Sequence, residues 1–578
     1  MVRRSTKAWP GAALAAALAV SVPWTASAQI RGGPPPYTPA ADARDLKSVL
    51  FNWTWHMGML RGIEEHELIV TLEYRGNGTI RVDGRPCMLT RYRASTNYQT
   101  PGQRIQYACT LPDGGTHTAI EVVSGRYAWN EDVPGAEIVP GEGRATPMPD
   151  AVDERLIRLW ASPQGAPKAA LAGAGIDPRQ MDRSPGLLLE DGPTTIGGTT
   201  VSWEGGKPVV TFPIPGVAGA TATATLDERF MAERVVVRHG STTTEFTYGD
   251  YRDWNNPLNR VEAYYAGRLT ERRDGTVVRD LTTEQTETGS VYVVVPVPDS
   301  VRRALTPDAP EEPPALFASD RSAELTSQAP TPRLPNGKPD LTGNWSSPGM
   351  NWRYGFRRCA PTQLEGCSPQ WNQTLDFEFE APSRFGPNRP LYKPEHWDRV
   401  IELDMWTNKY DPVMTCQPLG IPRNGPPRRI IQSPNDIVFF YGQYADGGGG
   451  YGEYRIVPTD GRKHDERQAL TTRYMGYTVG HWEGDTLVLD SISFNDFTWL
   501  ARGGFFHSDK MRVVERFTRQ GDEILYEVTV EDPEVLAAPW VMTPRILRLS
   551  DNPDAGLLPE RGHCEVYELE DITTQIRH

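Results

Sequence analysis

Short runs in which apolar and polar residues alternate, separated by Gly, Pro and Asn, extend over much of the chain. Such runs of period two predict β-strands. Two of them, residues 68–74 and 79–83, flank Asn77 and Gly78 and predict a β-hairpin that turns at this pair. Residues 153–174 differ, because their apolar positions follow helical spacing and then an Ala-rich stretch, which predicts a helical segment. Further strands are expected at 209–212, 221–226, 234–238, 243–248 and 291–296.

The beginning of the chain has the pattern of a secretory signal peptide. Two arginines and a lysine precede an apolar run at 12–22, and small residues at 26–28 form a cleavage site. The apolar run is too short to span a membrane. We therefore expect residues 1–28 to be removed after Ala28, and the mature protein to be periplasmic or secreted.

A Pro-rich stretch at 301–337 divides the mature chain. Its Pro, Ala, Glu, Ser and Thr residues are typical of an extended linker. The sequence therefore predicts an N-terminal β-rich domain at 45–300, with its helical segment near 153–174, and a C-terminal β-barrel-like domain at 338–578. The expected fold class is mainly β, with two antiparallel β domains and few helices.

Composition and charge argue against a nucleic-acid partner and against a transmembrane helix. The 578 residues include 16 Trp, 22 Tyr and 16 Phe, which is enough for hydrophobic cores. The formal net charge of −14 argues against nucleic acid, because neutralising phosphates requires a basic surface. After the signal peptide, no apolar run reaches the roughly 18 residues of a transmembrane helix.

The six cysteines of an exported chain predict disulfides. Six cysteines allow 15 connectivities, so the sequence does not determine the pairing. The expected pairs are Cys87–Cys109, Cys359–Cys367 and Cys416–Cys564, the last of which would tie the start of the C-terminal domain to its end. A zinc site is disfavoured because no two cysteines have a C-x₂₋₄-C spacing.

A second hairpin is predicted around Gly484 in the C-terminal region. If its loop has two residues, His481 and Asp490 lie on one face of the hairpin, and Trp482 lies on the opposite, core-forming face. On a shared polar face, the carboxylate of Asp490 could orient or charge the imidazole of His481. The alternative is a structural hydrogen bond between them, and a three-residue loop would remove the pairing altogether.

Most candidate site residues lie on this hairpin and on the glycine-containing loop that follows it, and Arg462 lies in a charged cluster at 460–467 that precedes it. For an enzyme, the acid–base candidates are His481, Asp490, Asp496 and His507. For a binding protein, the candidate ligand contacts are Trp482, Trp499, Arg502 and Arg462. Each of these residues also has a structural interpretation, as a core aromatic, a turn residue or part of a solvated loop.

Metal and cofactor motifs are not evident. His56 and His66 stand near glutamates, but their spacing does not match H-E-x-x-H. Residues 447–452 satisfy G-x-G-x-x-G, yet they lie between two predicted strands and open no helix for a phosphate. We therefore predict no metal site and no cofactor.

The C-terminal region resembles a large family of uncharacterised exported bacterial proteins over about residues 340–570. The segments that carry this resemblance are 340–345, 416–423, 459–464 and 480–490. The first of them contains Gly343-x-Trp345, which is similar to the entry motif of lipocalins (calycins). That likeness implies an up-and-down barrel whose Trp345 closes one end, and an ordinary antiparallel sandwich is the alternative.

Residues 222–297 resemble outer-membrane lipoprotein carrier-like domains. The similarity lies in a strand ending at Leu226-Asp227, a strand followed by Tyr251-Arg252-Asp253, and a last strand entering Pro296. It implies a curved sheet around an apolar cavity.

The function predicted from the sequence is binding of a small apolar or amphipathic molecule in the barrel-like C-terminal domain. One alternative is a cofactor-independent hydrolase, lyase or isomerase that uses the His/Asp residues named above. A second alternative is an interaction module for another protein of the cell envelope. Fold class alone does not separate these three functions.

Overall fold

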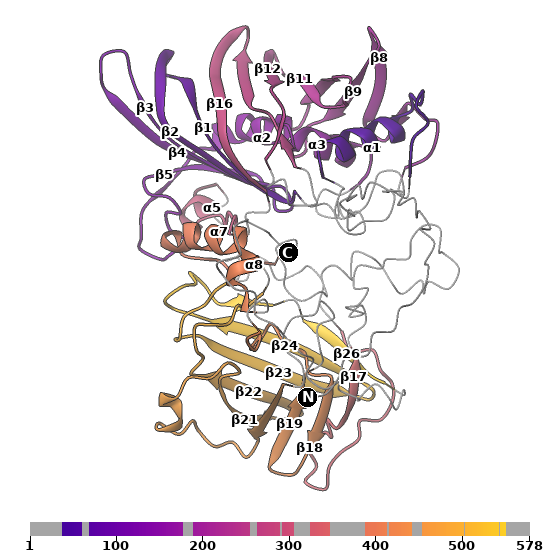
Figure 1. Cartoon of the computed structure of the whole chain (residues 1–578), viewed down its shortest axis with the longest axis vertical. Coiled ribbons are helices and arrows are strands. Elements are labelled where there is room, and N and C mark those ends of the chain that lie inside the picture. Colours follow the sequence, from indigo (N-terminus) through magenta and orange to yellow (C-terminus); the bar gives the residue numbers. More distant parts are fainter. Residues whose placement is uncertain are drawn as a thin grey trace, which may run out of the picture.

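The computed structural model describes residues 37–59, 69–176, 189–254, 263–288, 292–305, 324–346, 388–412, 416–441, 453–501, 503–542 and 544–550. These residues form two large antiparallel sheets, one from each half of the chain (Figure 1). Three short helices, α5 (Asp299–Leu305), α7 (Trp397–Met405) and α8 (Thr407–Tyr410), lie between the two sheets. The predicted mainly β fold is thus confirmed.

The N-terminal sheet has fourteen strands in the order β6-β5-β4-β3-β2-β1-β16-β15-β12-β11-β10-β9-β8-β7. Their bounds are β1 (Thr71–Val82), β2 (Arg85–Asn97), β3 (Gly102–Thr110), β4 (Thr116–Ser124), β5 (Tyr127–Glu131), β6 (Ala145–Pro147), β7 (Thr195–Ile196), β8 (Thr199–Glu204), β9 (Lys207–Pro213), β10 (Thr221–Leu226), β11 (Ala232–His239), β12 (Thr242–Gly249), β15 (Arg268–Arg273) and β16 (Thr276–Thr288). A separate short pair joins β13 (Arg252–Asp253) to β14 (Tyr264–Tyr265).

Three helices pack against one face of this sheet: α1 (Leu46–His56), α2 (Val152–Ala161) and α3 (Gly165–Gly173). Helix α2 touches both β4 and β11, which are far apart in the strand order, so the sheet must curve around it. Leu159 and Trp160 of α2 are fully buried in the resulting core. The helical segment predicted at 153–174 is therefore present, interrupted between its two helices at Pro163.

The hairpin predicted at Asn77 and Gly78 is wrong. Strand β1 runs unbroken through both residues, and the chain turns instead at Asp83 and Gly84. A Cβ on Gly78 would lie 2.0 Å from the carbonyl oxygen of Asp280 on β16, at a φ of +136°. The glycine therefore permits close approach of the neighbouring strand at a bulge, rather than a reversal of the chain.

The opposite face of strands β1–β5 is covered by helix α7 of the C-terminal half. The Arg104 guanidinium carbon lies 4.9 Å from the centre of the Trp397 ring, and the Tyr292 ring lies 5.2 Å from it. Arg93 on β2 forms ion pairs with buried Glu73 and with Asp398 at the start of α7. One hydrophobic cluster thus contains residues from both halves of the chain.

The C-terminal sheet is a nearly closed barrel with strand order β20-β19-β18-β17-β26-β24-β23-β22-β21, and β25 pairs with β24. Its strands are β17 (Gly343–Ser346), β18 (Arg429–Gln432), β19 (Asp436–Phe440), β20 (Tyr454–Pro458), β21 (Tyr477–Glu483), β22 (Thr486–Ile492), β23 (Arg512–Gln520), β24 (Glu523–Glu531), β25 (Trp540–Val541) and β26 (Arg545–Leu549). Trp345 on β17 is buried, and its Nε1 donates to the Leu341 carbonyl oxygen. The Arg519 guanidinium lies 5.0 Å from the centre of its ring.

The segment expected to be a linker makes specific contacts where the structure describes it. Helix α5 packs on β5 and β6. Further along, Thr326 and Ser327 donate their backbone N–H groups to the carboxylate of Glu523.

Within the described residues, no helix is long and apolar enough to cross a membrane. The predicted signal peptide lies outside these residues.

The disulfide predicted between Cys87 and Cys109 is present and joins β2 to β3. Cys416 is also disulfide-bonded. Its predicted partner Cys564, and the predicted pair Cys359–Cys367, lie outside the described residues, so these two pairings stay predictions.

Candidate binding site at the barrel seam

A pocket of about 520 Å³ lies at the seam of the barrel, where β20 and β21 face each other without pairing. It is lined by residues 453–458 on one side, residues 473–478 on the other, and Pro418. At one end the seam is closed, because Gly461 donates its N–H to the carbonyl oxygen of Gly480 at 3.1 Å. The pocket is therefore a gap between two strand edges within an otherwise continuous wall.

The backbone of β20 presents to this gap polar groups that pair with no other strand among the described residues. Glu453 and Thr459, at the two ends of the strand, hydrogen-bond to the β19 side. Because hydrogen-bonded pairs alternate along an antiparallel ladder, the backbone N–H and C=O groups of Tyr454 and Ile456 point to the seam. Among the described residues β20 has no second strand partner.

The inner wall of the pocket is polar. The side chain of Arg455 reaches into the barrel, where its guanidinium forms an ion pair of 2.6 Å with Glu515 on β23. Its Nε donates to the Tyr441 hydroxyl at 2.7 Å. Its Nη1 lies 3.4 Å from the Thr478 hydroxyl and 3.5 Å from that of Ser491, which are 2.8 Å from each other.

Electrostatics keep this buried group ionised. Burial alone lowers the pKa of Arg455, but the Glu515 carboxylate and the nearby tyrosines outweigh burial and raise it above its ordinary value. The Tyr526 hydroxyl donates to Glu515 Oε1 at 2.8 Å, and burial raises the pKa of Tyr526 well above its usual range. The network as a whole is neutral, with one cation and one anion.

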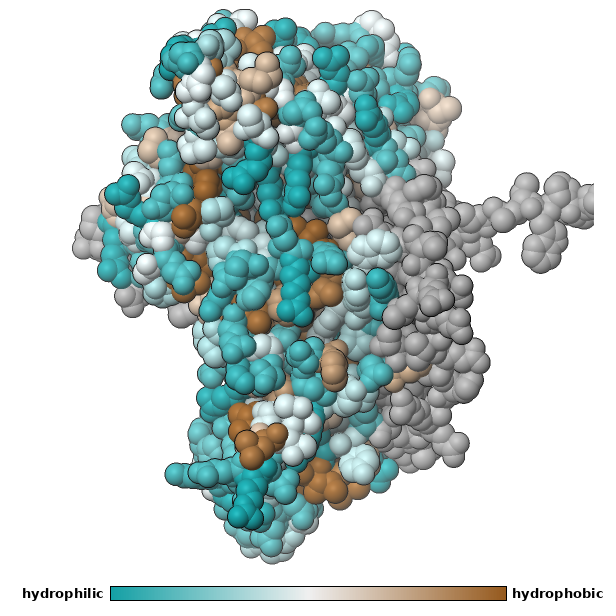
Figure 2. Space-filling view, turned by 60° about the vertical axis from the view of Figure 1, so that its left-hand side comes forward, coloured by the Kyte–Doolittle hydropathy of each residue, from teal (hydrophilic) through white to brown (hydrophobic). Residues whose placement is uncertain are grey.

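The outer rim of the pocket is apolar. Tyr454 and Ile456 are 59% and 63% exposed. Ile456 ends a row across three strands that also contains Val438 and Ile431. Apolar residues gather in patches at the lower end of the molecule, where the barrel lies (Figure 2).

The side chains of His481 and Asp490 lie on the same face of the hairpin, as predicted, but each contacts a different neighbour. The loop has two residues, Gly484 and Asp485, so His481 and Asp490 do share a face. His481 Nε2 contacts Glu483 at 3.1 Å, whereas Asp490 forms an ion pair with Arg512 at 2.8 Å. The two side chains are therefore each engaged with a different neighbour.

His507 is buried and bonds within the core. Its Nδ1 donates to the Ser508 carbonyl oxygen, so its Nε2 accepts from the Thr498 hydroxyl at 2.7 Å. Burial lowers the pKa of His507, although Ser508, Asp532 and Asp496 act in the opposite direction. Asp496 is itself exposed, so the structure does not gather the four acid–base candidates into one cluster.

The predicted ligand contacts lie at separate places. Trp499 is 4% exposed and belongs to the core, and Trp482 is partly buried with Lys338 above its ring. Arg462 forms a surface ion pair of 2.6 Å with Asp460. Arg502 lies outside the described residues.

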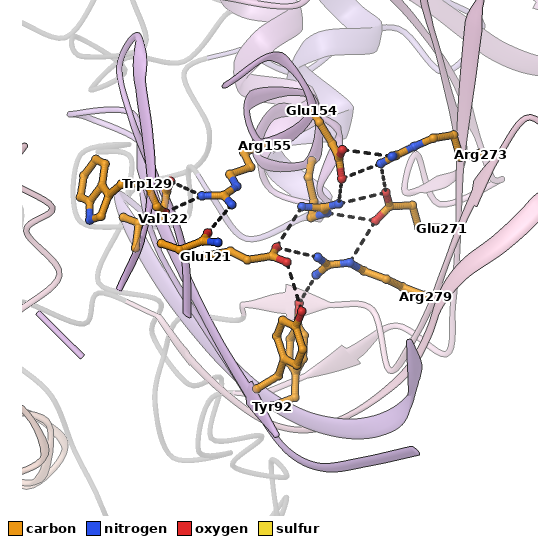
Figure 3. A network of polar contacts seen from close by, with 12 residues as sticks. Tyr92, Glu121, Val122, Trp129, Glu154, Arg155, Glu271, Arg273 and Arg279 are labelled. Carbon is orange, nitrogen blue, oxygen red and sulfur yellow. Dashed lines mark hydrogen bonds and ion pairs between the residues drawn. The ribbon is translucent and has the colours of Figure 1, made fainter. Parts of the chain in front are cut away.

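A second charged cluster lies in the N-terminal domain, between α2 and the sheet (Figure 3). Arg158 of α2 pairs with buried Glu271 at 3.0 Å, and Arg279 pairs with Glu121 at 2.9 Å. Glu154 at the start of α2 pairs with Arg273 at 2.6 Å; burial opposes ionisation of Glu154, but Arg158 and Arg273 lower its pKa to about 2. These contacts are mutually satisfied and hold α2 on the sheet.

Sequence reasoning missed the seam pocket. Nothing local in residues 454–457 indicates that they belong to a strand with one edge that has no strand partner among the described residues. The available signal was Arg455, an arginine within the short apolar strand Tyr454–Pro458, because a charge at an inward position must find a buried partner.

Comparison with known proteins adds little. No protein-family model matches the chain, and no curated protein matches it. A solved LolA-superfamily protein from Nitrosomonas europaea aligns at 9% identity over 45% of this chain and 97% of that chain. The TM-score of this alignment is 0.22.

Proposed function

We propose that this chain is an exported protein that binds a small apolar or amphipathic molecule at the barrel seam. The observation that carries the proposal is the pocket of about 520 Å³ with an exposed apolar rim and a buried polar inner wall. A concave site that is mostly apolar, with a few fixed polar groups, is the usual form of a small-molecule site. The Arg455 network supplies those fixed groups, because each of its members is held by others.

The test is displacement of a neutral fluorescent naphthylamine probe, combined with native mass spectrometry of the purified mature protein. Ile456→Glu places a charge on the apolar rim and should weaken probe binding at least about tenfold. Ile431→Glu is the matched control, because Ile431 lies in the same row but does not line the pocket. Equal binding by both variants and the parent, or no binding by the parent, would reject the proposal.

One observation favours protein binding as a second function. The backbone groups of Tyr454 and Ile456 offer an edge to which an extended segment of another protein could add as a strand. Ile456→Pro removes a seam-facing N–H without removing a bond to β19. If strand addition is the function, the Ile456→Pro variant should no longer bind the partner protein, whereas the Ile456→Val variant should still bind it.

A further inference from the structure

We propose that the molecule bound at the seam is an amphiphile with an anionic head, and that Arg473 holds this head. The inference rests on the proposed small-molecule function and specifies the chemical class of the ligand. Arg473 lines the pocket on the side opposite β20.

The hydrogen bonds of Arg473 leave part of its guanidinium available. Its Nη1 donates to the carbonyl oxygens of Gln468 and Thr471, and its Nη2 donates to Gln468 Oε1 at 2.9 Å. A guanidinium has five N–H donors, so these three contacts leave the Nε–H and one Nη2–H without a partner among the described residues. The free Nε–H can donate a charge-assisted hydrogen bond to an oxygen of an anionic head.

The charge of Arg473 is not neutralised by a carboxylate of the described chain. All three of its acceptors are neutral oxygens. The other arginine of the pocket, Arg455, is already paired with Glu515. The charged residues that line the pocket are Glu453, Arg455 and Arg473, and of the two arginines only Arg455 has an ion pair with a described carboxylate.

Arg473 is also held in position. Its guanidinium carbon lies 5.3 Å from the centre of the Tyr477 ring, in a cation–π arrangement. A fixed guanidinium loses little conformational entropy when it binds an anion, so its contribution to affinity is larger than that of a mobile surface lysine. The apolar part of the ligand would lie along Ile456 and Met475, which line the same pocket.

The experiment compares three probes with the same apolar chain and different heads: dodecanoate, 1-dodecanol and dodecyltrimethylammonium. Each is titrated against the bound naphthylamine probe. Dodecanoate should bind about tenfold more tightly than dodecanol, because a charge-assisted hydrogen bond adds to the apolar contact. Dodecyltrimethylammonium should bind more weakly than either.

Arg473→Gln should reduce the ratio of dodecanol to dodecanoate dissociation constants to near one, and Arg473→Lys should restore part of it. The matched control is Arg516→Gln, because Arg516 pairs with Glu483 outside the pocket; it should leave the ratio unchanged. A purely structural role for Arg473 would lower both affinities together and would not change the ratio.

Equal affinities for dodecanoate and dodecanol in the parent protein would overturn the inference and leave the proposed function standing. Failure of all three probes to bind would reject the proposed function itself.

Discussion

Arg455 and Glu515 form an ion pair of 2.6 Å in the barrel interior, although the seam and strands β21 and β22 separate their own strands, β20 and β23. The Thr478 and Ser491 hydroxyls, one from each intervening strand, lie beside the same guanidinium. Side chains thus connect the two sides of the seam where the backbone ladder is interrupted. Arg455 also lines the pocket, so the ion pair that connects the two sides of the seam fixes one wall of the site.

Replacing Arg455 alone should strongly destabilise the protein. Arg455→Met leaves the Glu515 carboxylate buried without its cation, and the expected loss in free energy of unfolding is about 3–5 kcal/mol. The double variant Arg455→Met/Glu515→Leu should recover much of this loss, because both charges are then absent. Urea denaturation of the single and double variants measures the difference.

The surface pair Arg512–Asp490 provides the comparison for that series. Arg512→Met should change the free energy of unfolding by no more than about 1 kcal/mol, because this pair is only partly buried. If the Arg455 and Arg512 variants lost equal stability, the Arg455–Glu515 pair would not be what holds the two sides of the seam together.

His507 should make stability depend on pH. Burial lowers its pKa below the ordinary value of 6.5, so the unfolded chain takes up a proton at a pH where the folded imidazole stays neutral. The unfolded state then binds more protons, and the free energy of unfolding falls as the pH drops below about 6.5. In His507→Gln this contribution should be absent, which a series of urea denaturations between about pH 5 and 7 would measure. An unchanged slope would show that the imidazole titrates alike in both states.

Gly78 should not tolerate a side chain. In Gly78→Ala, the Cβ would meet the Asp280 carbonyl oxygen and the backbone would keep a positive φ, at a cost on the order of 1–3 kcal/mol. The matched control is Gly249→Ala, since a Cβ on that strand glycine meets nothing within 4 Å. Thermal unfolding followed by circular dichroism compares the two. Equal melting temperatures would mean that β16 shifts freely to admit the methyl group.

The disulfide between Cys87 and Cys109 should contribute measurably to stability. It joins two adjacent strands across 22 residues, and its removal in Cys87→Ala/Cys109→Ala should cost about 2–4 kcal/mol. A variant is preferable to a reducing agent, because Cys416 is also in a disulfide. An unchanged denaturation midpoint would indicate that the strand ladder alone constrains this part of the chain.

The sequence predicted features that depend on local pattern. The mainly β class and the helices near residues 153–174 follow from periodicity. Disulfides follow from the chemistry of cysteines in a chain predicted to be exported, and Cys87–Cys109 was one of the expected pairs. The shared face of His481 and Asp490 was also predictable, because side-chain direction in a hairpin has a period of two.

Features set by distant residues were not predictable. Asp490 bonds Arg512 of the next strand, and no local pattern shows which strand will lie beside it. The hairpin at Gly78 was wrong because an Asn-Gly pair is typical both of a turn and of a strand that a neighbour approaches closely. The pocket exists because the edges of β20 and β21 do not pair. Whether they pair depends on how the whole sheet curves and not on the sequence of either strand.

The orientation of the β20 backbone has a consequence for solvent exchange. The amide hydrogens of Arg455 and Val457 point to β19, whereas those of Tyr454 and Ile456 point to the seam. Deuterium should therefore enter this short strand in an alternating pattern, quickly at Tyr454 and Ile456 and slowly at the residues between and after them. An occupant of the seam that excludes water would slow only the fast pair, so the pattern itself would report whether the site is filled.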